Sequence, residues 1–413
     1  MLFLTQVLPY PLDAGPKVRA YHMLRHLAAR HDVTLASFVR SGDTAAAIDH
    51  LAGICTEAHT VSMQRSWARN VGAGVKGLLT GLPIVVARDE IGAMASTLRS
   101  LVRRLSVDVI HADQTSMAGY GQLAATSARR RPATLLDQHN AIHQLSARMA
   151  AETRQPFVRQ VMRREARAFA RYEAAMCRAY DAVLTVTAAD RDHLLALYPP
   201  PEREQIASRF TVVPICVDPA LTSPVAPRPK APGEPPVIFH LGTMFWPPNV
   251  AGVLWFAGDV LPIIHRSRPD ARFVIAGKDP PPAVMALAAD PRITVTGYVA
   301  DPTPYLAEAD AFVVPLAAGS GMRVKILDAW LWGLPIVSTT LGAEGIDVHP
   351  GDDILLADDP AAFAHSVLRL LADGDLNQRL RRQGRAWVEA HYSYTAVYRQ
   401  VDNVYDRLLS GKM

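Results

Sequence analysis

Residues 311–338 decide the fold, and they read Ala-Phe-Val-Val-Pro-Leu-Ala-Ala-Gly-Ser-Gly-Met-Arg-Val-Lys-Ile-Leu-Asp-Ala-Trp-Leu-Trp-Gly-Leu-Pro-Ile-Val-Ser. The apolar run at the start predicts a buried strand, and the Pro-Ile-Val-Ser at the end predicts a second one. Between them, a loop from Gly319 to Gly321 opens a helix that ends at Gly333. A strand, a helix and a strand in this order indicate a parallel βαβ unit.

The same alternation runs through most of the chain. We predict strands at residues 2–7, 33–38, 107–112, 134–137, 182–186 and 210–213, and then at 237–241, 272–276, 293–296, 311–314, 336–338 and 354–357. Helical patterns separate these runs, so the sequence predicts an α/β protein built from two Rossmann-like halves. In open parallel sheets, ligands lie beyond the carboxyl ends of the strands, so we expect the site between the two halves.

The domain boundaries follow from a proline-rich stretch, residues 219–236, which contains seven prolines and almost no periodicity. Such a composition is typical of a semi-rigid linker. We therefore predict a first domain over residues 1–218 and a second over residues 237–390. A separate helical pattern over residues 391–413 follows the second domain.

Composition excludes several classes of protein. The chain has 413 residues, of which 49% are hydrophobic and 20% charged, which excludes wholesale disorder. We find no uninterrupted apolar run of about 18 residues, and the N-terminus reads as a first strand rather than a signal peptide. Three distant cysteines without a CxxC exclude a disulfide framework and a cysteine zinc site, and they favour a reducing, cytoplasmic compartment.

The helix after Gly321 has the character of an anion site. Free backbone N–H groups at a helix start bind anions, and glycines permit close approach. Arg323 and Lys325 add cations in the first turn, where they oppose the helix dipole, and a bound diphosphate would explain their placement. Lys325 and Asp328 also share a helical face, so a surface ion pair is the alternative.

This segment resembles the donor-binding motif of retaining GT-B glycosyltransferases of family 4, which includes bacterial mannosyl- and glucosyltransferases. The Glu-Ala-Met-Ala-x-Gly-x-Pro-Val-Val-like run of that family is matched by Asp328-Ala-Trp-Leu-Trp-Gly-Leu-Pro-Ile-Val337. The resemblance covers nearly the whole chain, because further segments follow in family order at residues 8–19, 185–190, 212–218, 239–242, 273–278 and 296–299.

The resemblance implies two Rossmann-like domains facing across a cleft, with a C-terminal helix that crosses back to the first domain. It implies transfer of a sugar, with retention, from a nucleotide diphosphate-sugar bound by the second domain. The acceptor, a glycan, a lipid-linked molecule or a small molecule, would lie on the first domain. The nucleotide-sugar is then a co-substrate, and no cofactor is expected.

The resemblance also implies the site residues. His139 follows the strand at 134–137 where the family carries an active-site histidine, and Arg323 and Lys325 would stabilise the departing diphosphate. The expected donor-binding residues are Gly15, Gly242, Gly319, Ser320, Gly321, Met322, Asp328 and Glu344. Ser320 and Asp328 replace two glutamates that the family often has, and no base follows Gly242. The alternatives are a structural histidine at 139 and a helix-capping Glu344. Lys17 would either lie near the phosphates or the acceptor, or only open a helix.

Two Asp-x-Asp triplets, at residues 190–192 and 373–375, lie where helices begin or join, so we predict structural roles and no metal. Basic residues are clustered in two places. Residues 64–88 mix bases with apolar side chains, and a later helical stretch holds Arg148, Arg154, Arg159, Arg163, Arg164, Arg167, Arg171 and Arg178. Part of this is a solvated face, and the excess favours contact with anionic lipid over nucleic acid, because no nucleic-acid motif accompanies it.

Two other functions are compatible with the same fold. A nucleotide-sugar epimerase would act on the donor without an acceptor. A non-catalytic sugar-nucleotide-binding protein is suggested by the replaced acids at residues 320 and 328. A nicotinamide dehydrogenase is disfavoured because no GxGxxG follows the first strand.

Overall fold

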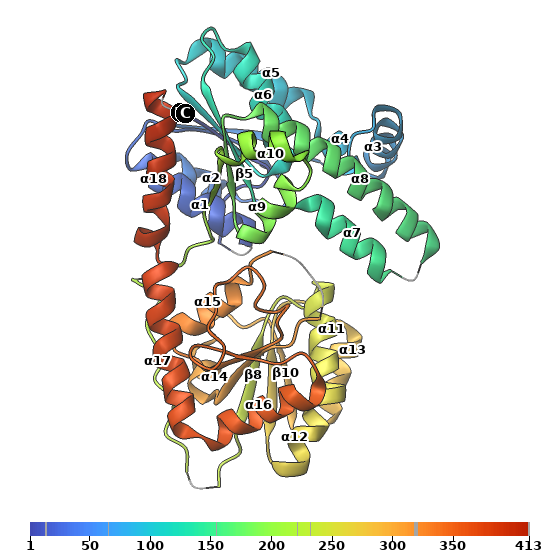
Figure 1. The fold of residues 1–413 in the computed structure, drawn as a ribbon, viewed down its shortest axis with the longest axis vertical. Helices are drawn as coiled ribbons and strands as arrows, with labels where there is room; N and C mark the ends of the chain where they lie inside the picture. The colour runs from blue at the N-terminus through green and yellow to red at the C-terminus, as the bar shows by residue number, and fades with distance from the viewer. Residues whose placement is uncertain are drawn as a thin grey trace. The chain divides into compact units, whose positions relative to one another are not determined.

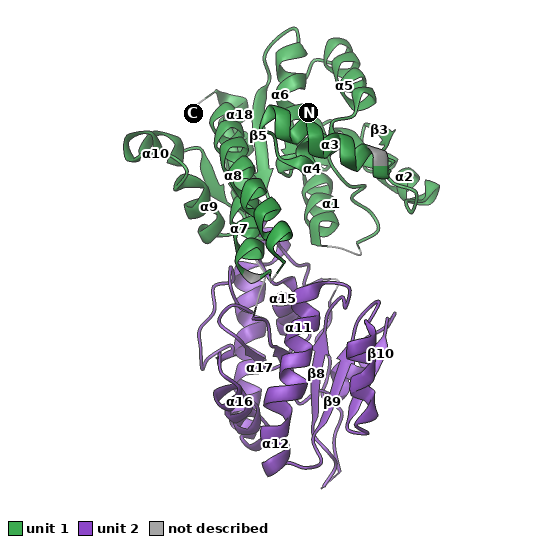
Figure 2. Cartoon of the chain, turned by 90° about the vertical axis from the view of Figure 1, so that its right-hand side faces the viewer, with its two compact units in different colours: residues 1–214, 398–413 green, residues 215–397 purple. Residues whose placement is uncertain are grey.

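The computed structural model describes residues 1–12, 15–64, 66–153, 155–220, 222–231, 233–317 and 321–411 (Figure 1). The chain forms two compact units (Figure 2). Unit 1 comprises Met1–Pro214 and Tyr398–Met413, and unit 2 comprises Ile215–Val397. Both are α/β units, as the sequence predicted.

Unit 1 is a seven-stranded parallel sheet in the order β3-β2-β1-β4-β5-β6-β7. The strands are β1 (Leu2–Thr5), β2 (Thr34–Val39), β3 (Glu57–Ser62), β4 (Val109–Asp113), β5 (Ala133–Gln138), β6 (Ala182–Thr185) and β7 (Phe210–Val212). The helices are α1 (Gly15–Ala28), α2 (Ala45–Ala52), α3 (Trp67–Thr80), α4 (Ile84–Asp89), α5 (Gly92–Arg104), α6 (Thr115–Ser127), α7 (Ile142–Glu152), α8 (Pro156–Ala179), α9 (Ala188–Leu195), α10 (Pro200–Ala207) and α18 (Tyr394–Ser410), the last of which begins in unit 2.

Unit 2 is a six-stranded parallel sheet in the order β10-β9-β8-β11-β12-β13. The strands are β8 (Val237–Leu241), β9 (Arg272–Ala276), β10 (Ile293–Gly297), β11 (Ala311–Val314), β12 (Ile336–Ser338) and β13 (Leu355–Leu356). The helical segments are α11 (Pro247–Trp255), η1 (Phe256–Val260), α12 (Leu261–Ser267), α13 (Pro282–Met285), η2 (Ala286–Ala289), α14 (Thr303–Glu308), α15 (Val324–Leu331), α16 (Pro360–Ala372) and α17 (Gly374–His391).

The central strands form because their apolar side chains are buried on both faces of each sheet. Every residue of β1, β4 and β11 is buried, as expected for strands covered by helices on both sides. In each unit the strand order reverses once, between β1 and β4 and between β8 and β11. Crevices at such reversal points, beyond the carboxyl ends of the strands, are where open α/β sheets bind ligands.

The units differ from the predicted domains at their edges. Residues 219–236, predicted as a semi-rigid linker, fall within unit 2, and their described part packs there. There, Val225 N–H donates to the Trp332 carbonyl at 2.9 Å and Arg228 N–H to the Ala307 carbonyl at 2.8 Å. The final helix begins at Tyr394, and residues 398–413 group with unit 1. Its Tyr405 is fully buried, and its hydroxyl shares a 2.6 Å hydrogen bond with His111 Nδ1 of β4.

One helical run among the described residues, Pro247–Ser267, is long and apolar enough to cross a membrane by length and composition. It covers α11, η1 and α12, and its residues Val253, Phe256, Val260 and Ile264 are fully buried in the hydrophobic core of unit 2. Its apolar residues are thus used for packing within the unit.

Candidate active site

The helix that the sequence places after the glycine loop is α15, and it begins at the carboxyl end of β11. Gly321 has a φ of +81°, a left-handed conformation that favours glycine. Arg323 occupies the N-cap position of α15, and its Nη1 donates to the Gly321 carbonyl at 2.5 Å. Met322 is buried. The predicted residues Gly319 and Ser320 lie outside the described residues.

Lys325 reaches from the first turn of α15 to the end of β8. Its Nζ donates to Asn249 Oδ1 at 2.9 Å, and Asn249 Nδ2 in turn donates to the Thr243 carbonyl at 2.8 Å. A Cβ atom at Gly242 would lie 2.6 Å from that Nζ, which is too close for real contacts. Glycine at this position therefore makes room for the ammonium group, and the predicted residues Gly242 and Lys325 are brought together.

The ammonium group of Lys325 is held by a neutral partner. Among the described residues, no carboxylate pairs with Lys325, and its recorded partner is the neutral amide of Asn249. Burial lowers the pKa of Lys325 to about 7, and the adjacent Arg323 contributes to the shift. A partly buried ammonium group with no carboxylate partner among the described residues is an arrangement that a phosphate-bearing ligand would stabilise.

Asp328 lies one turn further along α15, and it does not pair with Lys325, so the surface ion pair considered from the sequence is wrong. Its side chain is partly buried, and burial raises its pKa to about 7. Such a carboxyl group accepts hydrogen bonds from hydroxyl groups when ionised. It is a suitable partner for a ribose near the helix.

Glu344 lies in a turn after β12 and is partly buried. No helix starts there in the described chain, so the helix-capping alternative is wrong. The turn is tight, because a Cβ at Gly342 would lie 2.4 Å from Ser338 Oγ and 2.7 Å from the Val314 carbonyl oxygen. The backbone before Glu344 thus packs against the ends of β11 and β12, at the same edge of the sheet as α15.

In unit 1, His139 directly follows β5, and its Nε2 donates to Asp113 Oδ1 at 2.8 Å. Asp113 ends the neighbouring strand β4 and is fully buried, while 11% of the His139 side chain is exposed. His139 therefore stands at the carboxyl edge of the sheet, with one ring nitrogen fixed by a buried carboxylate and the ring partly open to solvent.

Two acids hold the loop after His139 in place. Glu173 of α8 accepts from Ile142 N–H at 2.7 Å and from His143 N–H at 3.1 Å, and Asp190 accepts from Ala141 N–H at 3.0 Å. Both acids are buried. They satisfy backbone donors at the start of α7, so the position of His139 depends on residues far along the chain.

The predicted Gly15 begins α1, and a Cβ there would meet open space, so no close backbone contact within the described structure requires glycine. Lys17 lies in the first turn of α1, with its Nζ 4.0 Å from Asp43 Oδ1.

Sequence comparison identifies the family. The profile described as Glycosyltransferase Family 4 matches residues 14–221, and the profile described as Glycosyl transferases group 1 matches residues 235–373. The first match alone covers more than half of the chain. This chain belongs to glycosyltransferase family 4. The resemblance drawn from the sequence is confirmed, and the family does not favour the epimerase alternative.

Relatives of this glycosyltransferase share its fold along nearly their whole length. Sucrose-phosphate synthase from Thermosynechococcus elongatus is 17% identical, with a TM-score of 0.71, and covers 100% of this chain and 99% of its own. HepE from Anabaena, solved in complex with UDP, is 14% identical, with a TM-score of 0.66 and coverages of 98% and 99%. At these identities the likeness shows the fold alone, which is the predicted GT-B class.

A curated relative from Klebsiella pneumoniae is described as an uncharacterized 44.6 kDa protein in the cps region. It is 22% identical over 176 residues, which are 40% of this chain and 44% of that protein. The match therefore spans less than half of the relative's length.

Sequence reasoning missed the buried ion pair beneath His139 in this family member. Arg19 of α1 donates to both carboxylate oxygens of Asp137, with Nη2 to Oδ1 at 2.8 Å and Nε to Oδ2 at 2.9 Å. Burial alone would raise the pKa of Asp137 and lower that of Arg19, but their ion pair reverses both shifts. The signal was present, because Arg19 ends the N-terminal segment that carries the family resemblance.

One cluster has the residue types of a metal site. Ligand atoms of His111, Asp113 and Asp137 lie within 4.8 Å of one another, and all three residues are buried. Burial lowers the pKa of His111 to about 4, so this imidazole is neutral at neutral pH. However, Arg19 already occupies both oxygens of Asp137, and His139 binds Asp113. The guanidinium group of Arg19 thus neutralises the cluster.

The Asp-x-Asp triplets make helix-end contacts. Thr187 Oγ1 accepts from Asp190 N–H at 2.9 Å in the first turn of α9, and Asp373 accepts from Leu376 N–H at 2.9 Å at the start of α17. These are capping hydrogen bonds.

Proposed function

We propose that this enzyme transfers a sugar, with retention, from a nucleotide diphosphate-sugar to an acceptor hydroxyl. The observation that carries the proposal is Lys325, a partly buried ammonium held by Asn249 of α11, with no carboxylate partner among the described residues. Relatives of the same fold support the choice of donor, because Anabaena HepE was solved with UDP and with UDP-glucose.

In the proposed reaction the bond between the anomeric carbon and the β-phosphate oxygen breaks, and its electron pair goes to the diphosphate. The acceptor oxygen bonds to the anomeric carbon, and its proton passes to an oxygen of the leaving phosphate. Negative charge develops on the diphosphate, where Lys325, Arg323 and the N–H groups of α15 stabilise it. Asp328 would accept from the ribose hydroxyls, and Glu344 would face the transferred sugar.

His139 is proposed to bind the sugar or the acceptor as a hydrogen-bonding partner. Because its Nε2 donates to Asp113, the other nitrogen, Nδ1, is the one that is left for a ligand. The buried acids Glu173 and Asp190 act as positioning residues, since they hold the backbone that follows His139.

The replacement Lys325→Ala tests the proposal. We expect a turnover about a hundredfold lower, because removing one preorganised charge from a leaving-group site costs several kcal/mol of barrier. Arg272→Ala, which removes an exposed cation of the same unit, is the matched control and should keep parental activity. A thermal-shift screen with UDP, GDP, ADP and their sugars would first identify the donor. Parental turnover in Lys325→Ala would contradict the proposal.

We also propose that the enzyme contacts anionic membranes through α3. The exposed fractions are 80% for Trp67, 72% for Leu78 and 83% for Leu79, and Val71 and Val75 lie on the same exposed face. No acidic residue occurs in α3, which carries Arg69 and Lys76. An apolar face with basic flanks and no acid is typical of helices that lie in a membrane interface.

Helix α8 adds positive charge beside this face. Arg164 of α8 donates to the Gly77 carbonyl of α3, so the two helices are neighbours. Arg163, Arg167 and Arg171 are exposed at four-residue spacing along α8. Co-sedimentation with vesicles containing phosphatidylglycerol should fall severalfold in Trp67→Ser/Leu79→Ser. It should be unchanged in Tyr298→Ser, which removes an exposed aromatic from unit 2. Equal sedimentation of both variants would contradict the contact.

A further inference from the structure

A cavity of about 560 Å³ opens at the amino-terminal edge of the first sheet. Asp108, which precedes β4, and Ala133, which begins β5, line it. His139 follows the other end of β5. The six residues of β5 separate the two edges, so the cavity lies roughly 20 Å of strand length from His139. It is not part of the site described above.

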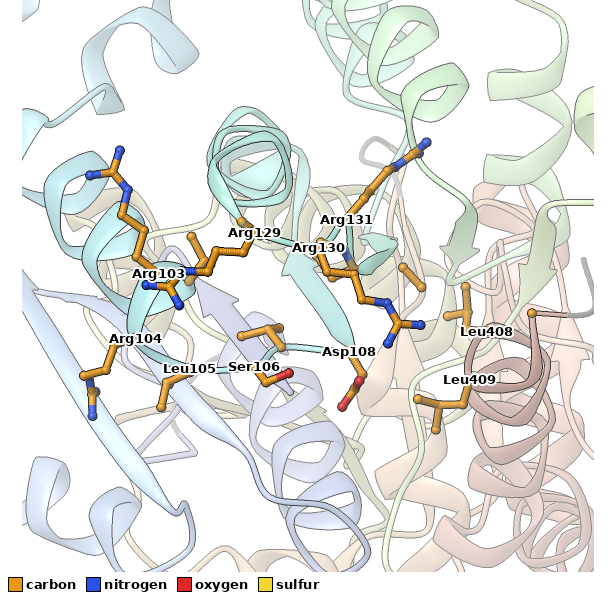
Figure 3. Close-up of a pocket in the computed structure, with 16 residues that line it drawn as sticks. Arg103, Arg104, Leu105, Ser106, Asp108, Arg129, Arg130, Arg131, Leu408 and Leu409 are labelled. Atoms are coloured by element: carbon orange, nitrogen blue, oxygen red, sulfur yellow. The ribbon is translucent and has the colours of Figure 1, made fainter.

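Arginine dominates the lining of this cavity. Arg103 and Arg104 come from the last turn of α5, and Arg129, Arg130 and Arg131 come from the segment between α6 and β5. Figure 3 shows that the two groups lie around one opening, with Asp108, Leu408 and Leu409 along another part of its rim. Among the described residues that line the cavity, Asp108 is the one acid, so the arginines outnumber the acids five to one.

Three of these arginines are not neutralised by neighbours. Arg104 pairs with Glu57, and Arg131 pairs with Asp181 at 3.2 Å. Arg103, Arg129 and Arg130 make no side-chain hydrogen bond or ion pair with any described residue, although all three are exposed. In Figure 3 the side chain of Arg129 extends toward the end of α5, and that of Arg130 extends toward Asp108 and Leu409.

The helix dipole accounts for only part of this cluster. A cation at the end of α5 or α6 is favoured by the exposed carbonyl groups there. That effect places one or two basic residues at each helix end, and it does not make two helix ends converge on the same cavity. Like charges that share a cavity repel one another, and a bound anion would relieve the repulsion.

We propose that this cavity binds a phosphate-bearing anion. Guanidinium groups bind phosphate oxygens through paired hydrogen bonds, and the unpaired Arg103, Arg129 and Arg130 supply them from two directions. The volume suits a small ligand rather than a single ion. Leu105, Leu408 and Leu409 add an apolar wall for a carbon chain or ring attached to the phosphate. The phosphate belongs either to a soluble diphosphate or to an anionic lipid headgroup.

Calorimetric titration with inorganic pyrophosphate tests the soluble source. The cavity variant is Arg129→Gln/Arg130→Gln, and the matched control is Arg99→Gln/Arg272→Gln, which removes two exposed arginines that do not line the cavity. Lys325→Ala, measured alongside, identifies any heat that comes from the proposed donor site. We expect binding at the cavity to weaken at least tenfold in the cavity variant, to persist in the control and in Lys325→Ala, and to fall with added salt.

Sedimentation with vesicles of phosphatidylglycerol and phosphatidylcholine tests the lipid source, with the same two double variants. Loss of vesicle binding in the cavity variant alone, without a cavity-dependent pyrophosphate signal, would assign the site to a headgroup. Loss of pyrophosphate binding in the cavity variant alone would assign it to a soluble anion. Identical pyrophosphate and vesicle binding by the parent and the cavity variant would overturn the proposal, whatever Lys325→Ala shows about the donor site.

Discussion

Asn249 offers a sharp test of how the donor site holds its charge. Asn249 Oδ1 accepts from Lys325 Nζ at 2.9 Å, so Asn249→Asp places a carboxylate beside the ammonium with almost no change in shape. At this distance and an effective dielectric constant of about 20, the attraction between unit charges is at most about 6 kcal/mol. The new carboxylate would raise the pKa of Lys325 from its value of about 7 and compete with a diphosphate for its charge.

Part of that attraction is lost when a diphosphate binds, so we expect binding of the nucleoside diphosphate to weaken about ten- to hundredfold, or about 1.4–2.8 kcal/mol. The pH dependence should change as well. In the parent, affinity is highest below pH 7, where Lys325 is protonated, and it falls as the pH rises above about 7. In Asn249→Asp this fall should begin at a higher pH, because the ammonium persists.

Calorimetry with UDP and GDP at pH 6 and pH 8 measures both effects. Asn249→Ala controls for the lost hydrogen bond to the Thr243 carbonyl, because it removes that bond without adding a charge. Asn403→Asp adds the same charge at an exposed position of α18. Unchanged affinity in Asn249→Asp, with the pH profile of the parent, would refute the role assigned to Lys325.

Three further outcomes are expected. Activity should survive EDTA, because Arg19 already neutralises the cluster of His111, Asp113 and Asp137 in unit 1. A complete loss of activity that Mg²⁺ or Mn²⁺ reverses would instead indicate a metal at His111. Deleting residues 391–413 should lower the melting temperature of unit 1 by ten degrees or more, because Tyr405 and its neighbours in α18 are buried there, and parental melting would contradict this. Asp328→Asn should raise the free energy of unfolding in urea by about 1–2 kcal/mol at pH 8 but not below pH 4, because burying the carboxylate costs free energy only above its unfolded pKa. The same change should weaken nucleoside diphosphate binding about ten- to hundredfold. Equal binding by the parent and the variant would remove Asp328 from the site.

Strand positions were the most predictable part of the fold. All twelve predicted strands correspond to strands of the structure, because central strands of parallel sheets are apolar throughout. β3 was missed, since its sequence Glu-Ala-His-Thr-Val-Ser is polar, and it lies at the edge of the sheet with a single buried residue. An edge strand needs less burial than a central one, so periodicity carries a weak signal there.

The site residues could be predicted where they lie close together in one segment of the sequence. The sequence alone placed Arg323, Lys325 and Asp328 in one helix, and it left an ion pair between Lys325 and Asp328 as the alternative to donor binding. In the structure the partner is Asn249 instead, because folding brings the first turn of α11 within reach of Lys325 in α15. The pair Arg19 and Asp137 is separated by 118 residues, so no local spacing could have revealed it.

Each unit gathers charged side chains at the carboxyl edge of its sheet, but with different partners. In unit 2 the reversal point between β8 and β11 gathers the cations Lys325 and Arg323, and no described carboxylate neutralises Lys325. In unit 1 the corresponding ends of β4 and β5 carry Asp113 and Asp137, and these are bound by His139 and Arg19. A diphosphate would therefore meet a cation without a described carboxylate partner in unit 2, whereas the acids of unit 1 already have partners of their own. This difference in charge supports the proposal that the second unit binds the donor and that the first unit, through His139, binds a neutral hydroxyl acceptor.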